Sequence, residues 1–314
     1  MSLSGRAAYR DELTHLAAAN PSILCLEADL GGTKHPFQAR FPERFLNLGI
    51  AELAGLDVAA GLAANGFIPF ISTFAPFAVL RAAEGVKLNM GYMGLNIKLV
   101  APYAGVSGAW FGTTHHCLED LAVLQSIPGI TIAAPYGEEE TRSVVRHAAA
   151  TAGPFYIRLG RNDALTSFDE QAANTRNGVL WHMHRPARLC LVSVGERGTQ
   201  ITLQALKMRP DVAHAHLSYL DAAHLTLAAA ELGGAYTSFL VVEEHRFFGG
   251  VASSLALLMP ESQVRVHSCG FSWPHTGGEH EDVLNVLGFG REALLRQIGG
   301  LLDKTQFNSC DGPD

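Results

Sequence analysis

Short apolar runs alternate with amphipathic segments along most of the chain, and this alternation constrains the fold more than any other feature. Short apolar runs with few charges are typical of strands buried on both faces of a sheet. In the first half they are residues 22–28, 44–48, 67–72, 96–102, 130–135 and 155–159. Strands that alternate with helices form parallel sheets covered by helices on both faces. The sequence therefore predicts an α/β fold with mainly parallel sheets.

The alternation divides the chain into two predicted domains. Residues 1–165 form the first α/β domain, and the pattern then breaks into a polar, aperiodic stretch over residues 166–187. That stretch predicts a linker. Alternation resumes over residues 188–303, which predicts a second, smaller α/β domain, and residues 304–314 are predicted to be a flexible tail.

Composition excludes several classes of protein. The formal net charge is −7 and no block of lysines or arginines occurs, which argues against nucleic acid as a partner. No apolar run is long enough to span a bilayer, and the first residues lack the apolar core of a secretory signal, so a cytoplasmic protein is expected. The five cysteines include no CxxC spacing, which favours reduced, buried thiols over a disulfide framework or a zinc site.

Polar and aromatic residues follow four predicted strands at the end where open α/β sheets bind their ligands. In chain order they are Asp29, Glu52, the pair Phe74 and Phe77, and His115. Each has a purely structural explanation: a helix dipole favours a glutamate in the first turn, two aromatics three apart fit a core stripe, and a loop histidine is usually solvated. Composition and spacing therefore leave the reaction open.

Three segments of the first half share an order and spacing that is specific. They are RFLNLGIAELAGLDVAAGLAANGFIPFISTFAPF (44–77), GTTHHCLEDLAVLQSIPGITIAAPYGEEE (112–140) and FYIRLGRN (155–162). Together they resemble the pyrimidine-binding domain of transketolase. The resemblance runs from about Arg6 to Asn162 and continues more weakly through VVEEHRFFGGVASSLALL (241–258) into the C-terminal domain of the same enzymes. It implies a transferase that uses thiamine diphosphate.

The resemblance also implies which residues hold the cofactor. In this family a glutamate hydrogen-bonded to the pyrimidine N1′ promotes the imino tautomer that activates the cofactor, and it matches Glu52. Phe74 and Phe77 match the aromatic residues against the aminopyrimidine ring. Asp29 matches a residue beside the thiazolium, and Leu30 matches the apolar wedge that keeps the cofactor bent.

Two adjacent histidines occupy the position of the family's Thr-His-Gln motif. His115 matches the histidine that faces the reacting carbon and bonds substrate hydroxyls, whereas His116 replaces the glutamine and is expected to be incidental. A metal site at this pair is disfavoured, because adjacent histidines point in different directions and no carboxylate spacing supports one.

Residues on the substrate side match only in part. Arg6 and Arg161 match two arginines that bind the sugar phosphate, and Thr33 stands where a serine assists them. Tyr103 replaces a phosphate-site histidine. Phe111 replaces an aspartate that reads a substrate hydroxyl, and an apolar ring cannot accept that hydrogen bond. These two replacements favour a specialised pathway, with a different ketose, a pyruvate-like donor or an unusual acceptor as the alternatives.

The half of the family's site that binds diphosphate is missing from the sequence. No Gly-Asp-Gly motif occurs, although the family uses it to hold the magnesium ion. The resemblance therefore implies a separate N-terminal subunit that carries diphosphate and Mg²⁺, an α2β2 heterotetramer, and a self-dimer formed by this chain.

Three hypotheses follow. The first is the C-terminal subunit of a two-component transketolase-like enzyme that transfers a two-carbon ketol unit from a phosphorylated ketose to an aldehyde. The second is the β-subunit of a 2-oxo acid dehydrogenase, or an enzyme resembling deoxyxylulose-phosphate synthase, that uses pyruvate. The third is a scaffold subunit without catalytic residues, against which the joint presence of Glu52, Phe74, Phe77 and His115 argues.

Overall fold

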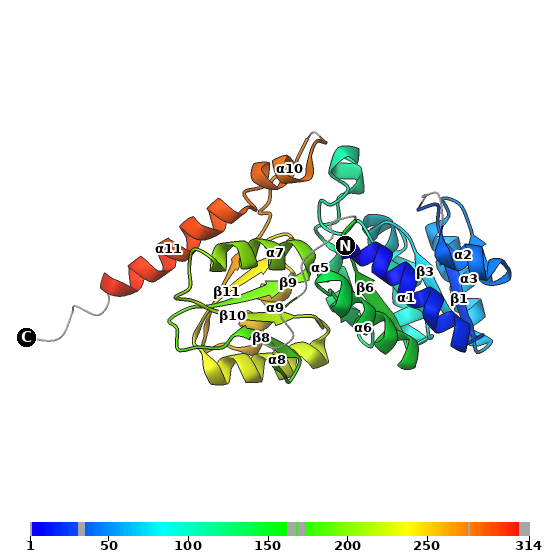
Figure 1. The fold of residues 1–314 in the computed structure, drawn as a ribbon, viewed down its shortest axis with the longest axis horizontal. Coiled ribbons are helices and arrows are strands. Elements are labelled where there is room, and N and C mark those ends of the chain that lie inside the picture. Colours follow the sequence, from blue (N-terminus) through cyan, green and yellow to red (C-terminus); the bar gives the residue numbers. More distant parts are fainter. Residues whose placement is uncertain (1, 31–34, 162–167, 169–173, 276, 308–314) are drawn as a thin grey trace, which may run out of the picture.

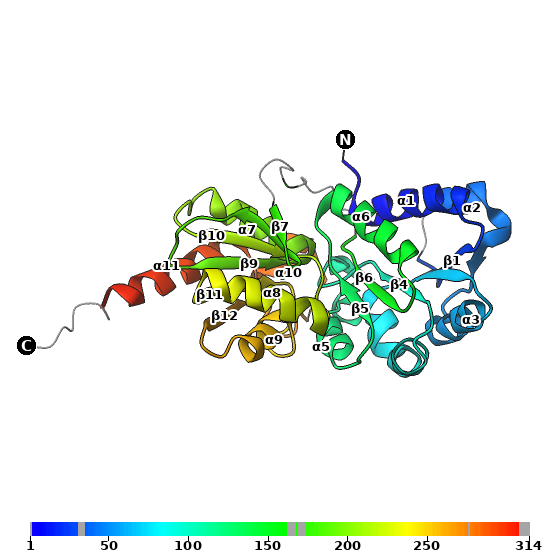
Figure 2. The ribbon, with the colours of Figure 1, turned by 90° about the horizontal axis from the view of Figure 1, so that it is seen from below.

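Two six-stranded sheets, each flanked by helices, form the two halves of the chain (Figures 1 and 2). The computed structural model describes residues 2–30, 35–161, 168, 174–275 and 277–307. The first half contains one sheet of parallel strands, and the second contains a mixed sheet in which parallel pairs predominate. The predicted α/β class with two mainly parallel sheets is confirmed, whereas the predicted boundary between the domains stays a prediction.

The first sheet has the strand order β2-β1-β3-β4-β6-β5, with all neighbours parallel. All its strands therefore end at the same edge. Most of their residues are buried, as expected for a sheet covered on both faces. The strands are β1 (Ile23–Glu27), β2 (Phe45–Asn47), β3 (Ile68–Ser72), β4 (Lys98–Ala101), β5 (Thr131–Ala133) and β6 (Phe155–Arg158).

Helices connect these strands. Ser4 caps the N-terminus of the first one by accepting a hydrogen bond from the backbone N–H of Ala7 at 3.3 Å. The α-helices are α1 (Gly5–Ala19), α2 (Pro36–Arg40), α3 (Glu52–Ala64), α4 (Ala83–Gly85), α5 (Asp120–Gln125) and α6 (Gly137–Ala150). The 3₁₀ turns are η1 (Pro42–Arg44), η4 (Ala109–Phe111) and η5 (Thr113–His115).

The helical pattern that follows β3 does not form one regular α-helix. Two π-helical stretches, η2 (Phe77–Arg81) and η3 (Val86–Tyr92), flank the short α4. A π turn contains more residues than an α turn, so it changes the faces on which successive side chains lie, and such turns are frequent at functional sites.

The second sheet has the strand order β12-β11-β9-β10-β8-β7. Its strands are β7 (Asn174–Arg176), β8 (Val179–Met183), β9 (Cys190–Val194), β10 (Ala213–Leu217), β11 (Ser238–Glu243) and β12 (Gln263–His267). Its helices are α7 (Gly195–Leu206), α8 (Ala222–Ala235), α9 (Val251–Leu258), α10 (His280–Val286) and α11 (Arg291–Phe307). Figure 1 shows α11 extending away from the second half.

Part of the predicted linker belongs to this sheet. Strands β7 and β8 lie within residues 166–187 and pair antiparallel with each other, and β8 also pairs with β10. Asn177 and Gly178 join them with φ values of 49° and 79°, as a two-residue type I′ hairpin turn requires. The prediction was wrong for residues 174–183 because the first strand, Asn174–Arg176, is short and polar and leads directly into the Asn-Gly turn, so the stretch resembles irregular chain. Residues 169–173 lie outside the described residues.

Two further predictions concern the tail and the thiols. Helix α11 continues to Phe307, past residue 304 where the tail was predicted to begin, and residues 308–314 lie outside the described residues. Cys25, Cys117, Cys190 and Cys269 are free and buried. Within the described part of the chain, none of the helices has the length and apolarity needed to cross a membrane.

The two halves are joined through their backbones. Ala134 donates its N–H to the Ser218 carbonyl at 2.7 Å, and Leu220 donates to the Ile132 carbonyl at 2.8 Å. These bonds connect the end of β5 to the residues that follow β10. The second half therefore contacts the first sheet at the end of β5, on the side of the sheet where the strands end and the candidate residues lie.

Candidate active site

Most of the predicted site residues lie where strands of the first sheet end. Asp29 and Leu30 follow β1, Glu52 begins α3 after β2, Phe74 and Phe77 follow β3, Tyr103, Phe111 and His115 follow β4, and Arg161 follows β6. Arg6 lies in the first turn of α1. Thr33 lies outside the described residues, so its predicted role is neither supported nor contradicted.

An aromatic cluster forms the centre of the site, and we define it as Phe74, Phe77, Tyr103, Phe111 and His115. The Phe74 ring lies 4.4 Å from Tyr103 and 5.6 Å from His115 between centroids, and Phe77 lies 5.2 Å from His115. Phe74 and Phe77 are only half-buried. A core stripe would be fully buried, so these rings instead form the wall of a partly open site.

Glu52 is a buried acid at the edge of this cluster. Its side chain is 4% exposed, and both of its carboxylate oxygens contact Nη1 of Arg81, at 3.3 and 3.2 Å. The Arg81 guanidinium also lies over the Phe77 ring, 4.4 Å from its centroid. Arg81 was not predicted from the sequence. Its position four residues after Phe77 on a helical segment was the available signal, since residues at that spacing are neighbours on a helix.

His115 lies in the cluster as a half-buried ring. It stacks on Phe111 at 4.5 Å with an interplanar angle of 23°, and its Nδ1 lies 2.9 Å from the Thr114 hydroxyl oxygen. Burial and the positive charge of Arg81 lower the pKa of His115. The imidazole is therefore neutral at neutral pH and offers one nitrogen that donates and one that accepts.

His116, the neighbour of His115, is buried. Burial lowers its pKa most strongly, while the backbone of Ala109 and the carboxylate of Glu244 act in the opposite direction. Within the described residues, neither ring nitrogen makes a hydrogen bond of normal geometry. The predicted division between His115 and His116 is consistent with these different surroundings and stays a prediction.

Two arginines meet at the Tyr103 hydroxyl. Nη1 of Arg6 donates to it at 3.1 Å and Nε of Arg161 donates at 3.0 Å. The Arg161 guanidinium also lies 3.6 Å from the centroid of the Trp110 ring, another contact that was not predicted from the sequence. Burial and the nearby Arg10 lower the pKa of Arg6. Two convergent guanidinium groups with partly desolvated charge suit an anionic group such as a phosphate.

The loop that carries His115 is held by the second half of the chain. Thr113 donates its hydroxyl to the Pro274 carbonyl, and the Gly278 N–H donates to the Ala109 carbonyl at 3.3 Å. A Cβ on Gly277 would lie 2.6 Å from the Trp110 carbonyl oxygen, closer than real Cβ atoms come. Only glycine allows this approach, so the second half fixes the position of the loop.

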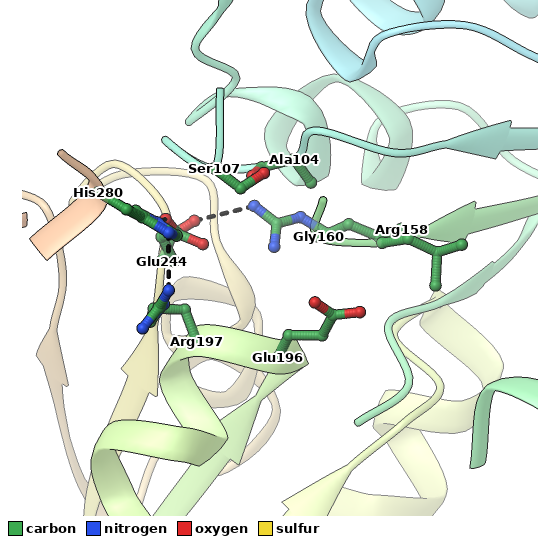
Figure 3. A pocket seen from close by; sticks show the side chains of 9 residues that line it. Ala104, Ser107, Arg158, Gly160, Glu196, Arg197, Glu244 and His280 are labelled. Atoms are coloured by element: carbon green, nitrogen blue, oxygen red, sulfur yellow. Dashed lines mark hydrogen bonds and ion pairs between the residues drawn. The ribbon is translucent and has the colours of Figure 1, made fainter. Parts of the chain in front are cut away.

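A charged pocket lies between the two halves. Figure 3 shows Arg158 from the first half and Glu196, Arg197, Glu244 and His280 from the second around it. Its free space is about that of one water molecule, which is too small for a sugar or a cofactor. We therefore assign this pocket a structural role.

Asp29 and Leu30 are less clearly connected to the cluster. Asp29 is exposed and has a φ of 47°, whereas Leu30 is buried. Both precede residues 31–34, which lie outside the described part. Among the described residues, no group of three or more His, Cys, Asp or Glu side chains is arranged to hold a metal ion.

Comparisons with known proteins identify relatives along the whole chain. The protein family described as "Transketolase, pyrimidine binding domain" matches residues 1–165. The chain is 31% identical over 300 residues to a "Putative transketolase C-terminal section" from Methanocaldococcus jannaschii, covering 93% of this chain and 94% of that protein. It is 29% identical over 301 residues to one of the subunits of an apulose-4-phosphate transketolase from Phocaeicola vulgatus, covering 93% and 95%.

A solved structure shows the same similarity in three dimensions. It is described as "Split gene transketolase, inactive beta4 tetramer" and superposes with a TM-score of 0.81 at 30% identity. The superposition covers 96% of this chain and 98% of that one. The similarity therefore extends over both halves and is not confined to the first sheet.

Proposed function

The chain belongs to the transketolase family, and from this premise we propose that it is the C-terminal subunit of a two-component, thiamine diphosphate-dependent transketolase. Such an enzyme transfers a two-carbon ketol unit from a phosphorylated ketose to an aldehyde. The observation that carries the proposal is the convergence of the buried Glu52 with Phe74, Phe77 and His115 at one end of a parallel sheet. A scaffold subunit has no need of this arrangement.

The surroundings of Glu52 fit the aminopyrimidine of thiamine diphosphate. Phe74 and Phe77 offer half-buried aromatic faces, and within the described residues the carboxylate contacts a single guanidinium nitrogen, which leaves its other acceptor positions available. When bound, thiamine diphosphate supplies a thiazolium that stabilises a carbanion. Glu52 would hold a proton at the pyrimidine N1′, and Asp29 and Leu30 would lie beside the thiazolium.

His115, Tyr103 and the two arginines would act on the substrate. The neutral imidazole of His115 can donate to or accept from a substrate hydroxyl or carbonyl. Arg6 and Arg161, held by the Tyr103 hydroxyl, would bind the phosphate of the donor or the acceptor. Phe111 stacks on His115 and gives the site an apolar wall.

We assign the rest of the cofactor site to a partner. An N-terminal subunit would hold the diphosphate and Mg²⁺, and two copies of each chain would form a cytoplasmic α2β2 heterotetramer around a dimer of this chain. The names of two relatives support this assignment, since one is a transketolase subunit and the other a split-gene transketolase. Both are similar to this chain over nearly their full length.

Glu52→Gln in the reconstituted complex tests the proposal. The amide cannot share a proton with N1′, so turnover of a ketose phosphate with an aldehyde should fall by at least about 10²-fold. Glu43→Gln is the matched control, because its side chain is 67% exposed and lies outside the site. Unchanged turnover in Glu52→Gln, with intact assembly, would favour the scaffold hypothesis.

A pyruvate-using reaction is the second candidate. The apolar Phe111 ring beside His115 favours it, because that wall suits a donor without a hydroxyl at this position. Carbon dioxide released from pyruvate by the complex would support this reaction. Ketol transfer without carbon dioxide release would support the transketolase reaction instead.

A further inference from the structure

Each of the two arginines proposed to bind phosphate directly follows a glycine. Gly5 begins α1 and precedes Arg6, and Gly160 lies two residues after β6 and precedes Arg161. Neither glycine has a φ in the left-handed region, so their backbone conformations are open to other residues as well. The surrounding atoms therefore decide which residues these two positions can hold.

One side chain from the second half lies against both glycines. A Cβ on Gly5 would collide with Oε1 of Glu196, and a Cβ on Gly160 would collide with Oε2 of the same carboxylate. At Gly160 the three heavy atoms nearest to such a Cβ all belong to Glu196. The carboxylate therefore contacts both chain segments that carry the arginines, with one oxygen on each, and leaves no room for a side chain at either glycine.

Glu196 is held in a fixed place by its own half of the chain. It is the second residue of α7, which packs on β9 and β11, and its side chain is buried. Figure 3 shows this side chain extending from the start of α7 toward Gly160 in the first half. The first turn of α1 contains no acidic residue, so the carboxylate beside Gly5 supplies negative charge at the positive end of that helix. That stabilising effect explains the contact with Gly5 but not the contact with Gly160.

The two segments in contact with Glu196 carry groups that meet at one point. Nη1 of Arg6 and Nε of Arg161 both donate to the Tyr103 hydroxyl, at 3.1 and 3.0 Å. Tyr103 thus fixes the ends of the two side chains, whereas Glu196 contacts the glycine that precedes each of them. A phosphate bound by both guanidinium groups requires both to be oriented in advance, so a shift of either backbone segment weakens its binding.

We infer that Glu196 is a positioning residue for the phosphate-binding arginine pair. It acts through the backbone of Gly5 and Gly160 and does not itself touch the substrate. This inference rests on the proposed function and extends it, because it gives the second half a part in donor recognition that is separate from its contact with the His115 loop. The effect is specific to substrates with a phosphate, since a ketose without one does not use the arginine pair.

Steady-state kinetics of the reconstituted complex test this with fructose 6-phosphate and fructose as donors. The measured quantity is the ratio of kcat/KM for fructose 6-phosphate to kcat/KM for fructose. In Glu196→Ala this ratio should fall at least about fivefold, through a higher KM for the phosphorylated donor, because the arginines lose their alignment with the phosphate. Glu196→Gln keeps the length of the side chain and should recover most of the loss. Glu261→Ala, the matched control, removes an exposed acid from the same half and should leave the ratio unchanged.

A double-mutant cycle tests the contact with Gly160 directly. Gly160→Ala should displace the Glu196 carboxylate and lower the ratio when Glu196 is present. In Glu196→Ala the added methyl group enters space that the carboxylate has left, so Gly160→Ala should lower the ratio there by less than about twofold. If Glu196→Ala fails to assemble, Gly5→Ala and Gly160→Ala displace the same carboxylate from opposite sides, and both should lower the ratio.

The outcomes separate a positioning role from a purely structural one. An unchanged ratio in Glu196→Ala would overturn the inference, even if both kcat/KM values fall together, since a purely structural role affects both donors alike. Additive effects of Glu196→Ala and Gly160→Ala would overturn it as well. If the wild-type complex prefers another ketose phosphate, that donor and its unphosphorylated form replace the pair. A wild-type complex that transfers no ketol unit from any ketose phosphate would instead refute the proposed function, which is a different result.

Discussion

Replacing Asp120 with asparagine should destabilise the chain strongly, because Asp120 neutralises a buried guanidinium. Oδ2 of Asp120 accepts from Nε of Arg158 at 2.8 Å and from the Tyr156 hydroxyl at 2.8 Å. The two side chains of the ion pair are 0% and 6% exposed. Arg158 also donates to the Glu244 carbonyl at 2.9 Å, so this pair connects the two halves.

The magnitude follows from this burial. Burial alone would lower the pKa of Arg158, but the carboxylates of Asp120 and Glu244 raise it above its usual value. Arg158 stays charged in Asp120→Asn, because a guanidinium does not lose its proton in proteins and the Glu244 carboxylate remains beside it. Asparagine keeps the shape of the side chain and an oxygen acceptor for Arg158. Its NH₂ group would lie where Oδ1 has no hydrogen-bond partner among the described residues, so the change removes the charge and also leaves a buried donor unpaired. Breaking a buried pair from one side costs about 3–5 kcal/mol, which is about a fifth or more of the roughly 5–15 kcal/mol of a typical domain.

Urea denaturation followed by circular dichroism, at one fixed protein concentration, measures the effect. Asp57→Asn is the matched control, since Asp57 is exposed and should change the free energy of unfolding by less than about 1 kcal/mol. Adding Arg158→Met to Asp120→Asn should recover part of the loss, because no buried charge then lacks its partner. A loss below about 1 kcal/mol in Asp120→Asn would refute the reasoning.

Two further predictions concern the arginine pair and a buried lysine. Tyr103→Phe removes the hydroxyl that orients Arg6 and Arg161. In steady-state kinetics, KM for a phosphorylated ketose should therefore rise about tenfold, with kcat little changed. The same rise in KM for an unphosphorylated ketose would contradict this prediction. Burial lowers the pKa of Lys98 to about 8, so between pH 8 and 10 the folded chain binds fewer protons than the unfolded chain and its stability rises with pH. Relative to Lys98→Met, the free energy of unfolding of wild type, measured by urea denaturation, should increase by about 1.4 kcal/mol per pH unit over this interval. A difference between the two proteins that does not change with pH would contradict the lowered pKa of Lys98.

The alternation of apolar runs was sufficient to predict every strand of the first sheet. Each run from residue 22 to residue 159 contains one strand, because a strand buried on both faces must be apolar at nearly every position. The hairpin of β7 and β8 was missed for the opposite reason. Its first strand is short and polar, and an Asn-Gly turn resembles irregular chain unless both flanking strands are recognised.

The candidate site shows a similar division. Resemblance to a family selected residues that the structure brings together, including Phe74, Phe77 and His115. It could not select Arg81 or Trp110, because their contacts depend on the π-helical turn after β3 and on the conformation of a loop. The four-residue spacing places Arg81 near Phe77, but local spacing does not encode the contact of Arg81 with Glu52 or that of Trp110 with Arg161, because tertiary packing sets both.

The attachment of the His115 loop to the second half has a consequence for how the protein is made. Thr113 bonds a carbonyl 161 positions further along the chain. A ribosome therefore releases the strands of the first sheet long before it has produced the segment on which this loop rests. A polypeptide interrupted during translation would contain the whole aromatic cluster and still lack the segment that holds the His115 loop, so only a nearly finished chain can fix this loop in place.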